Sequence, residues 1–185
     1  MNSIEIMMEE HRNIKRMLGV IRKYCSRILA GEEIRYEDFF KIIDFIRNYA
    51  DKHHHGKEEL LLFSRMMEEL GSPAEKLIKF GMNVEHDFGR QFVHDLEDAV
   101  KRVLEGDMDA RLDVIASAIS YTHLLNRHIE KEDGVVYKYA QNNLSQETQK
   151  KLDQDCLTFE RKAREEGRQD KYLALLSEME SRVNK

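Results

Sequence analysis

Apolar residues recur every three or four positions through most of this 185-residue chain, a spacing that places them on one face of an α-helix. The first such stripe consists of Ile4, Met7, Ile14, Leu18, Ile21, Cys25 and Ile28. Proline occurs once and tryptophan never, while Glu, Lys, Arg, Leu and Met dominate. This composition favours helix over sheet. The sequence therefore predicts an all-α fold.

Three short breaks divide residues 1–143 into four helical segments. The breaks lie near Glu33, at Gly71-Ser72-Pro73 and at Gly106, with Ser72 placed to cap the next helix and Pro73 at its first position. Short connections make neighbouring helices antiparallel, so we expect an antiparallel up-down four-helix bundle. Residues 144–185 are predicted to form one or two further amphipathic helices, split near Gly167, that pack on the bundle.

Composition excludes several classes of function. Charged residues make up 35% of the chain and the net charge is -5, so no broad basic surface is available for a nucleic acid. The N-terminal stretch "MNSIEIMMEEHRNIKRM" is charged throughout, and no apolar run approaches the roughly 18 residues of a membrane span. Cys25 and Cys156 lie far apart, which argues against a disulfide framework or a thiolate zinc site. We expect a cytoplasmic protein with neither a nucleic-acid nor a membrane partner.

Each of the four apolar stripes is interrupted by a histidine, and two of these histidines are followed four residues later by a glutamate. The six residues are His11, His54 with Glu58, His86, and His128 with Glu132. Burying such groups costs several kcal/mol per charge unless they are paired or bind a metal. A single histidine on an apolar face is more often a hydrogen-bonded core residue than a ligand, so the relative heights of the six along the bundle decide between these readings.

Their positions along the predicted helices agree. Residues equally far from a turn lie at similar heights in an antiparallel pair, because each residue rises about 1.5 Å. The matched pairs are His11 and His54 about Glu33 (22 and 21 residues), Glu58 and His86 about Ser72 (14 and 14), and His86 and His128 about Asp107 (21 and 21). All four helices thus bring polar side chains to one layer of the core, which predicts a metal site.

The His-x-x-x-Glu spacing suggests two metal ions. Residues four apart share a helical face, so each pair can place an imidazole on one metal while its carboxylate reaches a second. Glu58 and Glu132 would then bridge the two ions. A nitrogen and oxygen donor set without thiolate suits iron or manganese better than structural zinc. The spacing also differs from the Glu-x-x-His pairs of ferritin-like di-iron bundles, and no HExxH metalloprotease motif occurs.

These segments resemble the haemerythrin family in its broad HHE cation-binding form. The matching stretches are "EEHRNIKRML", "HHGKEELLLF", "EHDFGR" and "YTHLLNRHIEKED". The resemblance implies two non-haem iron ions with an oxo or hydroxo bridge, iron being expected rather than manganese or another divalent metal. It also implies His11, His54, His86 and His128 as terminal ligands and Glu58 and Glu132 as bridges.

One residue departs from the family pattern. Oxygen-carrying haemerythrins have a second histidine four residues after the third-helix ligand, and here that position is Arg90. Arginine stays protonated and cannot coordinate a metal. We therefore expect one imidazole fewer, a position open to water, substrate or a neighbouring side chain, and Arg90 paired with a bridging glutamate or a bound anion. Glu85, next to His86, is not expected to reach the metal.

The three consecutive histidines are separated by their phase on a regular helix. The apolar stripe of their segment predicts His54 as the ligand and His53 as an inward neighbour of the site. His55 and Glu59 fall on the opposite side, where we expect a solvent-exposed pair. Tyr121 lies one heptad before His128 and is a further candidate for contact with the ligands.

The resemblance implies a protein that binds or senses dioxygen, or that reduces peroxide or nitric oxide. The sequence does not separate these roles, and it leaves open whether the protein is an enzyme. The missing histidine favours redox chemistry over reversible oxygen carriage. The alternative from another class is an iron-storage or iron-handling protein that uses the same ligands.

Overall fold

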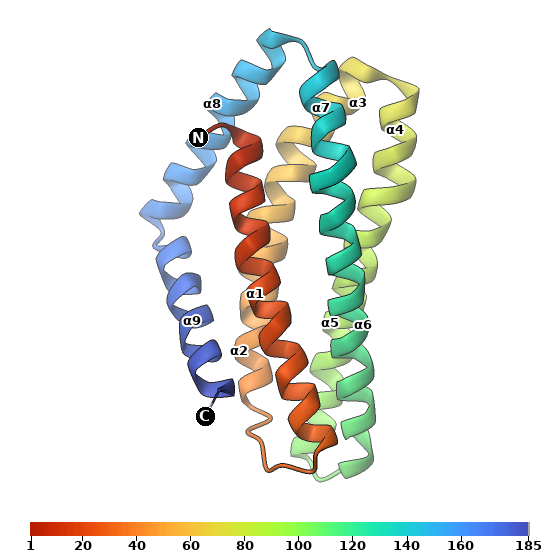
Figure 1. The fold of residues 1–185 in the computed structure, drawn as a ribbon, viewed down its shortest axis with the longest axis vertical. Helices are drawn as coiled ribbons and strands as arrows, with labels where there is room; N and C mark the ends of the chain where they lie inside the picture. The colour runs from red at the N-terminus through yellow and green to blue at the C-terminus, as the bar shows by residue number, and fades with distance from the viewer. Residues whose placement is uncertain (185) are drawn as a thin grey trace.

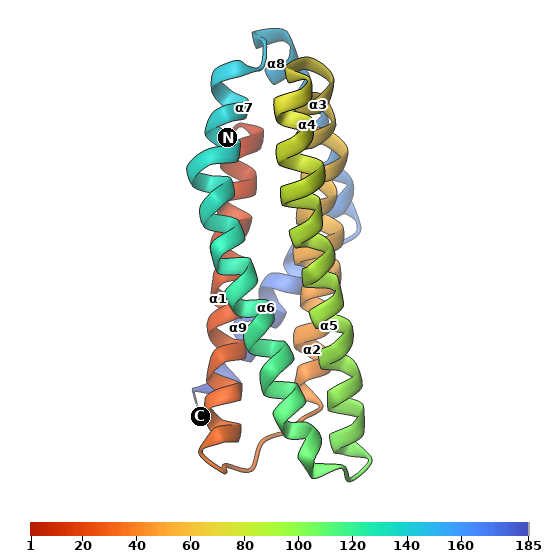
Figure 2. The same cartoon turned by 90° about the vertical axis from the view of Figure 1, so that its right-hand side faces the viewer.

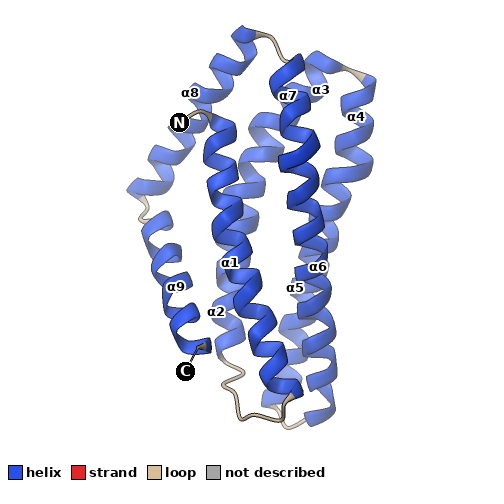
Figure 3. Cartoon of the chain, in the orientation of Figure 1, coloured by secondary structure: helices blue, strands red, loops and turns tan. Residues whose placement is uncertain are grey.

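The structure, a computed structural model, describes residues 1–184, and nearly all of them are helical (Figure 3). The prediction of an all-α fold is confirmed. Four long helical segments lie side by side along the longest axis of the molecule, and the chain reverses direction at each joint between them (Figures 1 and 2). The last two helices form a separate layer along one side of this group (Figure 1).

The first long segment is the single helix α1 (Ser3–Leu29), which begins with a capping box. The Asn2 side chain accepts a hydrogen bond from the backbone N–H of Glu5, and the Glu5 carboxylate accepts one from the backbone N–H of Asn2, each at 2.9 Å. The second segment is continuous and consists of α2 (Asp38–Phe45), η1 (Ile46–His55), η2 (Glu58–Phe63) and α3 (Ser64–Leu70).

The third and fourth long segments are also built from several helical pieces. The third consists of α4 (Ser72–Leu77), η3 (Ile78–Met82) and α5 (Asn83–Leu104). The fourth consists of η4 (Met108–Ala110), α6 (Arg111–Lys131), η5 (Glu132–Val136) and α7 (Tyr137–Asn143). Two helices then complete the chain, α8 (Gln146–Glu165) and α9 (Arg168–Val183).

The helix breaks lie at the predicted positions, with one difference in detail. Gly71 and Gly106 have φ of +65° and +102°, a backbone conformation that favours glycine and ends a helix sharply. Gly167, where the last two helices were expected to separate, has φ of +67°. The cap predicted at Ser72 is absent, because Ser72 is already the first residue of α4 and no side chain caps that helix.

Two apolar cores lie on either side of the predicted polar layer. The larger includes residues of α1, α2, α5, α6 and α9, among them Ile21, Phe39, Val100, Ala118 and Leu176. The smaller lies toward the other end of the long segments and includes Met7, Phe63, Ile78, Tyr137 and Leu152. Because Leu152 belongs to α8 and Leu176 to α9, both C-terminal helices share these cores.

Two further features concern the cysteines and the apolar character of the helices. Cys25 and Cys156 are both buried and unpaired. Across residues 1–184, no helix combines the length and the apolar character required to cross a membrane.

The packing of α9 predicts the effect of two matched substitutions. Leu176 is fully buried, whereas Leu157 on α8 is 54% exposed. We expect Leu176→Ala to lower the free energy of unfolding by about 2 to 5 kcal/mol, because it removes buried apolar surface and leaves a cavity. Leu157→Ala should change it by less than about 0.5 kcal/mol. Urea denaturation followed by circular dichroism measures both, and two equally small effects would show that α9 does not share the core.

Candidate metal centre

The structure brings the six predicted ligands together in the core. All six are buried, with at most 1% of each side chain exposed. The imidazole rings of His11 and His54 lie 4.5 Å apart between centroids, and those of His86 and His128 lie 4.7 Å apart. His128 Nε2 is 3.0 Å from the carboxylate of Glu132, the residue four positions later. The four long segments therefore do place these side chains in one layer.

Widened helical turns coincide with this layer. In η1, η2 and η5 the backbone hydrogen bonds span five residues instead of four, so each residue turns through less than the roughly 100° of an α-helix. Consecutive side chains on such a segment are spread over a narrower arc. His53, His54 and His55 are consequently all buried, with 0%, 1% and 4% exposed.

The expectation that His55 faces solvent with Glu59 is therefore wrong. It assumed a regular α-helix through residues 53–59, and η1 does not follow one. The His55 ring stacks on that of His86 at 3.8 Å between centroids, and it lies 5.8 Å from the ring of His128. Glu59 is part-buried and pairs with His86 rather than with His55.

The ligand atoms fall into two groups that share Glu58. The first comprises His55, Glu58, His86 and His128, and the second comprises His11, His54, Glu58 and Glu132. Within each group the ligand atoms lie within 4.8 Å of one another, so each could hold one metal ion. His55 supplies a third imidazole to the first group, which corrects the expectation that replacement of a histidine by Arg90 leaves the site short of an imidazole.

Each of the five histidines in these groups directs Nε2 to the centre and donates a hydrogen bond from Nδ1 to a carboxylate outside it. The pairs are His11 with Asp133 (2.7 Å), His54 with Glu10 (2.9 Å), His55 with Asp51 (3.3 Å), His86 with Glu59 (2.6 Å) and His128 with Glu85 (2.8 Å). A carboxylate can only accept, which fixes the proton on Nδ1 and leaves Nε2 free to bind metal. The sequence did not predict this role for any of these carboxylates: Glu85 was named only as a residue that would not be a ligand, and Glu59 only as a solvent-exposed partner of His55.

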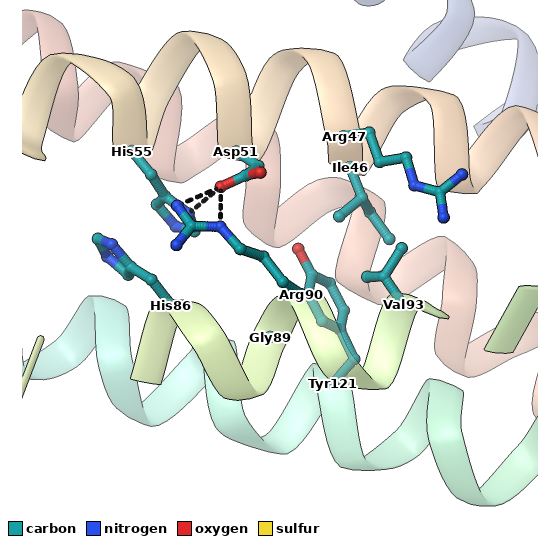
Figure 4. Close-up of a pocket in the computed structure, with 9 residues that line it drawn as sticks. All are labelled: Ile46, Arg47, Asp51, His55, His86, Gly89, Arg90, Val93 and Tyr121. Carbon is teal, nitrogen blue, oxygen red and sulfur yellow. Dashed lines mark hydrogen bonds and ion pairs between the residues drawn. The ribbon is translucent and has the colours of Figure 1, made fainter. Parts of the chain in front are cut away.

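Arg90 joins two of these outer carboxylates, and Figure 4 shows its contact with one of them, Asp51. Its Nε donates to Asp51 at 2.9 Å, one Nη donates to Glu59 at 2.7 Å, and the other donates to Asp87 at 2.9 Å. Neither Glu58 nor Glu132 pairs with it, so the predicted pairing with a bridging glutamate is wrong. The guanidinium instead holds the acceptors of His55 and His86.

A second buried polar cluster lies next to His54. The Lys57 ammonium, 1% exposed, donates to Glu10 and to Glu160 of α8. His53 Nε2 donates to Glu10 at 3.0 Å, so His53 is linked to His54 through that shared carboxylate. The carboxylates of Glu10 and Glu160 with His53 could also surround a cation, but Lys57 already places a positive charge between them.

Two buried tyrosines lie near the candidate metal centre. The Tyr137 hydroxyl donates to Glu58, and its ring is parallel to that of His11 at 5.5 Å between centroids. Tyr137 is the first residue of α7, and the sequence analysis did not single it out. Tyr121 is 2% exposed and lies beside Gly89 of α5, and its hydroxyl has no hydrogen-bond partner within residues 1–184.

The protonation states follow from burial and the opposing carboxylates. Burial lowers the pKa of His54 to about 4 and that of His55 well below its usual range, so both are neutral. Burial also opposes protonation of His11 and His86, but the nearby carboxylates of Asp133 and Glu132 for His11, and of Glu132 and Glu59 for His86, raise each pKa to about 9.

The pKa values of the two central carboxylates, Glu58 and Glu132, shift in opposite directions. Burial and the charge of Glu132 raise the pKa of Glu58 to about 8. Burial also opposes ionisation of Glu132, but its neighbours His128 and His11 hold its pKa well below the usual range. The pKa of His128 rises to about 10 because the charge of Glu132 outweighs the effect of burial. Without a metal, the centre therefore stores protons near neutral pH.

Several potential ligand atoms at the centre have no hydrogen-bond partner, and these atoms are suited to bind metal ions. Among residues 1–184, the buried side-chain atoms that make no hydrogen bond include His54 Nε2, one oxygen of Glu58 and both oxygens of Glu132. Such orphaned buried atoms are rare because each forfeits its interaction with water. Here they face one another at the centre and belong to neutral imidazole and carboxylate, the ligands that iron and manganese accept.

A comparison with known families agrees with this geometry. The family model described as hemerythrin HHE cation binding domain matches residues 2–140. That range contains every member of the two four-residue groups. No curated protein and no solved structure matches the chain.

The role assigned to His55 predicts a change in metal content. We expect His55→Ala to reduce the metal bound per chain from two ions toward one, because the group of His55, Glu58, His86 and His128 loses a ligand. His94→Ala is the matched control, since His94 is 62% exposed and lies near Asp98 on the surface, outside both groups. Elemental analysis after loading with ferrous iron and gel filtration measures both. Equal metal content in the two variants would remove His55 from the ligand set.

The protonated histidines predict pH-dependent metal binding. Metal ions require neutral imidazoles, and His11, His86 and His128 have pKa values of about 9, 9 and 10 in the metal-free centre. Binding at neutral pH should therefore release protons, and the apparent affinity should weaken as the pH falls. Isothermal titration calorimetry in two buffers of different ionisation enthalpy measures the release. Identical heats in the two buffers would contradict this prediction.

Proposed function

Because the chain belongs to the hemerythrin HHE cation-binding family, we propose that it holds two non-haem iron ions and binds, senses or reduces dioxygen or a related small oxidant. The observation that carries this proposal is the pair of four-residue groups that share Glu58. Two ions on a shared carboxylate lie close enough to act on one small molecule together. Peroxide and nitric oxide belong to the same class of small oxidants.

The ligands would be distributed unequally between the two ions. His55, His86 and His128 would hold one ion and His11 and His54 the other, with Glu58 reaching both and Glu132 completing the second group. When bound, iron would supply one-electron redox chemistry and open positions for the oxidant. Manganese fits the same donors, and the family assignment is what favours iron here.

The protein's own residues would orient the histidines of this centre. The five outer carboxylates keep a proton on Nδ1 of each histidine, so that Nε2 is the atom that faces the centre and that binds metal once it is deprotonated. Tyr137 donates a hydrogen bond to Glu58 and thereby orients the shared carboxylate. The apolar cores enclose the layer from both ends of the long segments.

The scaffold of this proposal is a four-helix antiparallel bundle over residues 1–143, with residues 144–185 as an extension that packs on it. The chain reverses direction between successive long segments, which supports the antiparallel bundle (Figure 1). Residues of α8 and α9 belong to the two apolar cores, which supports the packing of the extension on the bundle. We also propose a cytoplasmic location, which the two unpaired, buried cysteines favour because thiols persist in a reducing compartment.

Metal content and reactivity with dioxygen test this function on one sample. We expect anaerobic loading with ferrous iron to give about two iron ions per chain, one for each group of ligands. Many ions per chain would instead indicate iron storage, and none would leave the histidines as hydrogen-bonded core residues.

Exposure of the loaded protein to dioxygen then separates carriage from turnover. His55 restores the third imidazole, yet the centre is also reached by a cavity, so we expect oxidation to the diferric form, followed by consumption of peroxide or nitric oxide under reducing conditions. A stable oxy spectrum that reverses on removal of dioxygen would contradict this and would support a carrier. Absorption spectroscopy in the near-ultraviolet and visible range follows both outcomes.

A further inference from the structure

A cavity of about 250 Å³ lies between η1, α5 and α6 and ends at the candidate metal centre. His55 and His86 form its inner end, and Arg47, Asp51 and Arg90 lie at its outer edge. Figure 4 shows these side chains arranged around one space between the helices. The cavity therefore connects solvent with the ion that His55 and His86 would hold, and the inference below rests on the proposed function in this one respect.

The cavity is larger than a diatomic oxidant requires. Its volume is several times the roughly 30 Å³ that one water takes up in the liquid. An apolar protein cavity of about 150 Å³ already holds a molecule the size of benzene. A passage for dioxygen or nitric oxide alone would not need this space.

The walls of the cavity are apolar. They are formed by Ile46, Val93, the backbone at Gly89 and the ring of Tyr121. Gly89 and Tyr121 lie on neighbouring helices, and a Cβ at Gly89 would lie 3.7 Å from the Tyr121 ring, an ordinary contact distance. An aliphatic group would therefore find apolar contacts on several sides.

One polar group at the cavity lacks a protein partner. The Tyr121 hydroxyl points from α6 toward η1 (Figure 4), and it makes no hydrogen bond to any of residues 1–184 although the residue is 2% exposed. A hydroxyl without a protein acceptor can donate to a ligand that brings an oxygen atom.

The charges at the outer edge select against an ionic ligand. Arg90 is neutralised by Asp51, Glu59 and Asp87, and Arg47 is paired with Glu97. No cation at this edge is left to attract an anion, and the carboxylate of Asp51 is already held by Arg90 and His55. The ligand that fits is uncharged.

We propose that this cavity binds a small uncharged organic molecule with an apolar body and a hydroxyl or hydroperoxyl head, the head lying beside the Tyr121 hydroxyl. The apolar body contacts Ile46 and Val93, and the Tyr121 hydroxyl donates a hydrogen bond to the head oxygen. Alcohols and alkyl hydroperoxides share this chemistry, and for a centre that reacts with small oxidants the hydroperoxide is the substrate class.

Titration of the zinc-loaded protein tests the proposal, because zinc does not consume the hydroperoxide. The probes are tert-butanol and tert-butyl hydroperoxide, with pivalate and tert-butylammonium as charged molecules of the same shape. Shifts of the backbone amide signals of Gly89 and Val93 in two-dimensional NMR spectra report binding. We expect saturable shifts with both uncharged probes and none with the charged ones, and tighter binding of the hydroperoxide if it is the natural class.

Three variants make the test specific. Tyr121→Phe should weaken binding of the uncharged probes about fivefold, the effect of one lost hydrogen bond. Val93→Phe should abolish binding, because the ring occupies the cavity. Tyr139→Phe, a part-buried tyrosine outside the cavity, is the matched control and should bind as the parent does. Zinc content, measured on each sample, shows that the variants remain folded around the metal.

The outcomes separate this proposal from the proposed function. Absence of saturable shifts with tert-butanol in a protein that carries two zinc ions would overturn the proposal and leave the metal centre standing. Equal binding of charged and uncharged probes, or an unchanged affinity in Tyr121→Phe, would also overturn it. A protein that binds the uncharged probes but no metal would contradict the proposed function while supporting the cavity.

Discussion

Glu58 and Glu132 are completely buried at the centre of the molecule, and the surrounding structure depends on how their charge is compensated. Removing a carboxylate from water costs several kcal/mol, and two close together repel each other as well. Five imidazoles surround the pair, yet one oxygen of Glu58 and both oxygens of Glu132 find no hydrogen-bond donor among residues 1–184. In the metal-free centre the protonated His11, His86 and His128 compensate this charge near neutral pH, and bound metal ions would replace those protons.

The outer carboxylates continue this pairing of opposite charges away from the centre. Each of the five histidines is held between an inner position and an acidic side chain, and Arg90 or Lys57 in turn holds three of those acids, namely Asp51, Glu59 and Glu10. Charges therefore alternate from the centre toward the surface. Lys57 also bonds to Glu160, which places α8 in contact with the residues that orient His54. The C-terminal helices thus contribute to the site as well as to the cores.

Much of this arrangement could be predicted from the sequence, because it depends on periodicity and on distance from the turns. His11, His54, His86 and His128 were placed in one layer by counting residues, and that count tolerates an error of one or two positions. The role of His55 depended on helical phase, which does not tolerate one. The wide turns of η1 changed that phase, and nothing in "DKHHHGKEELLLF" distinguishes them from an α-helix. The outer carboxylates were missed because chains rich in Asp and Glu carry many such residues, and only three-dimensional contacts single out Asp51 or Asp133.

The central claim is that two metal positions share Glu58. Crystals of the iron-loaded protein, measured at the iron absorption edge, test it most directly through the anomalous difference density. We predict two peaks, one among His55, Glu58, His86 and His128 and the other among His11, His54, Glu58 and Glu132. A single peak, or peaks outside this layer while both groups keep their present geometry, would contradict the claim.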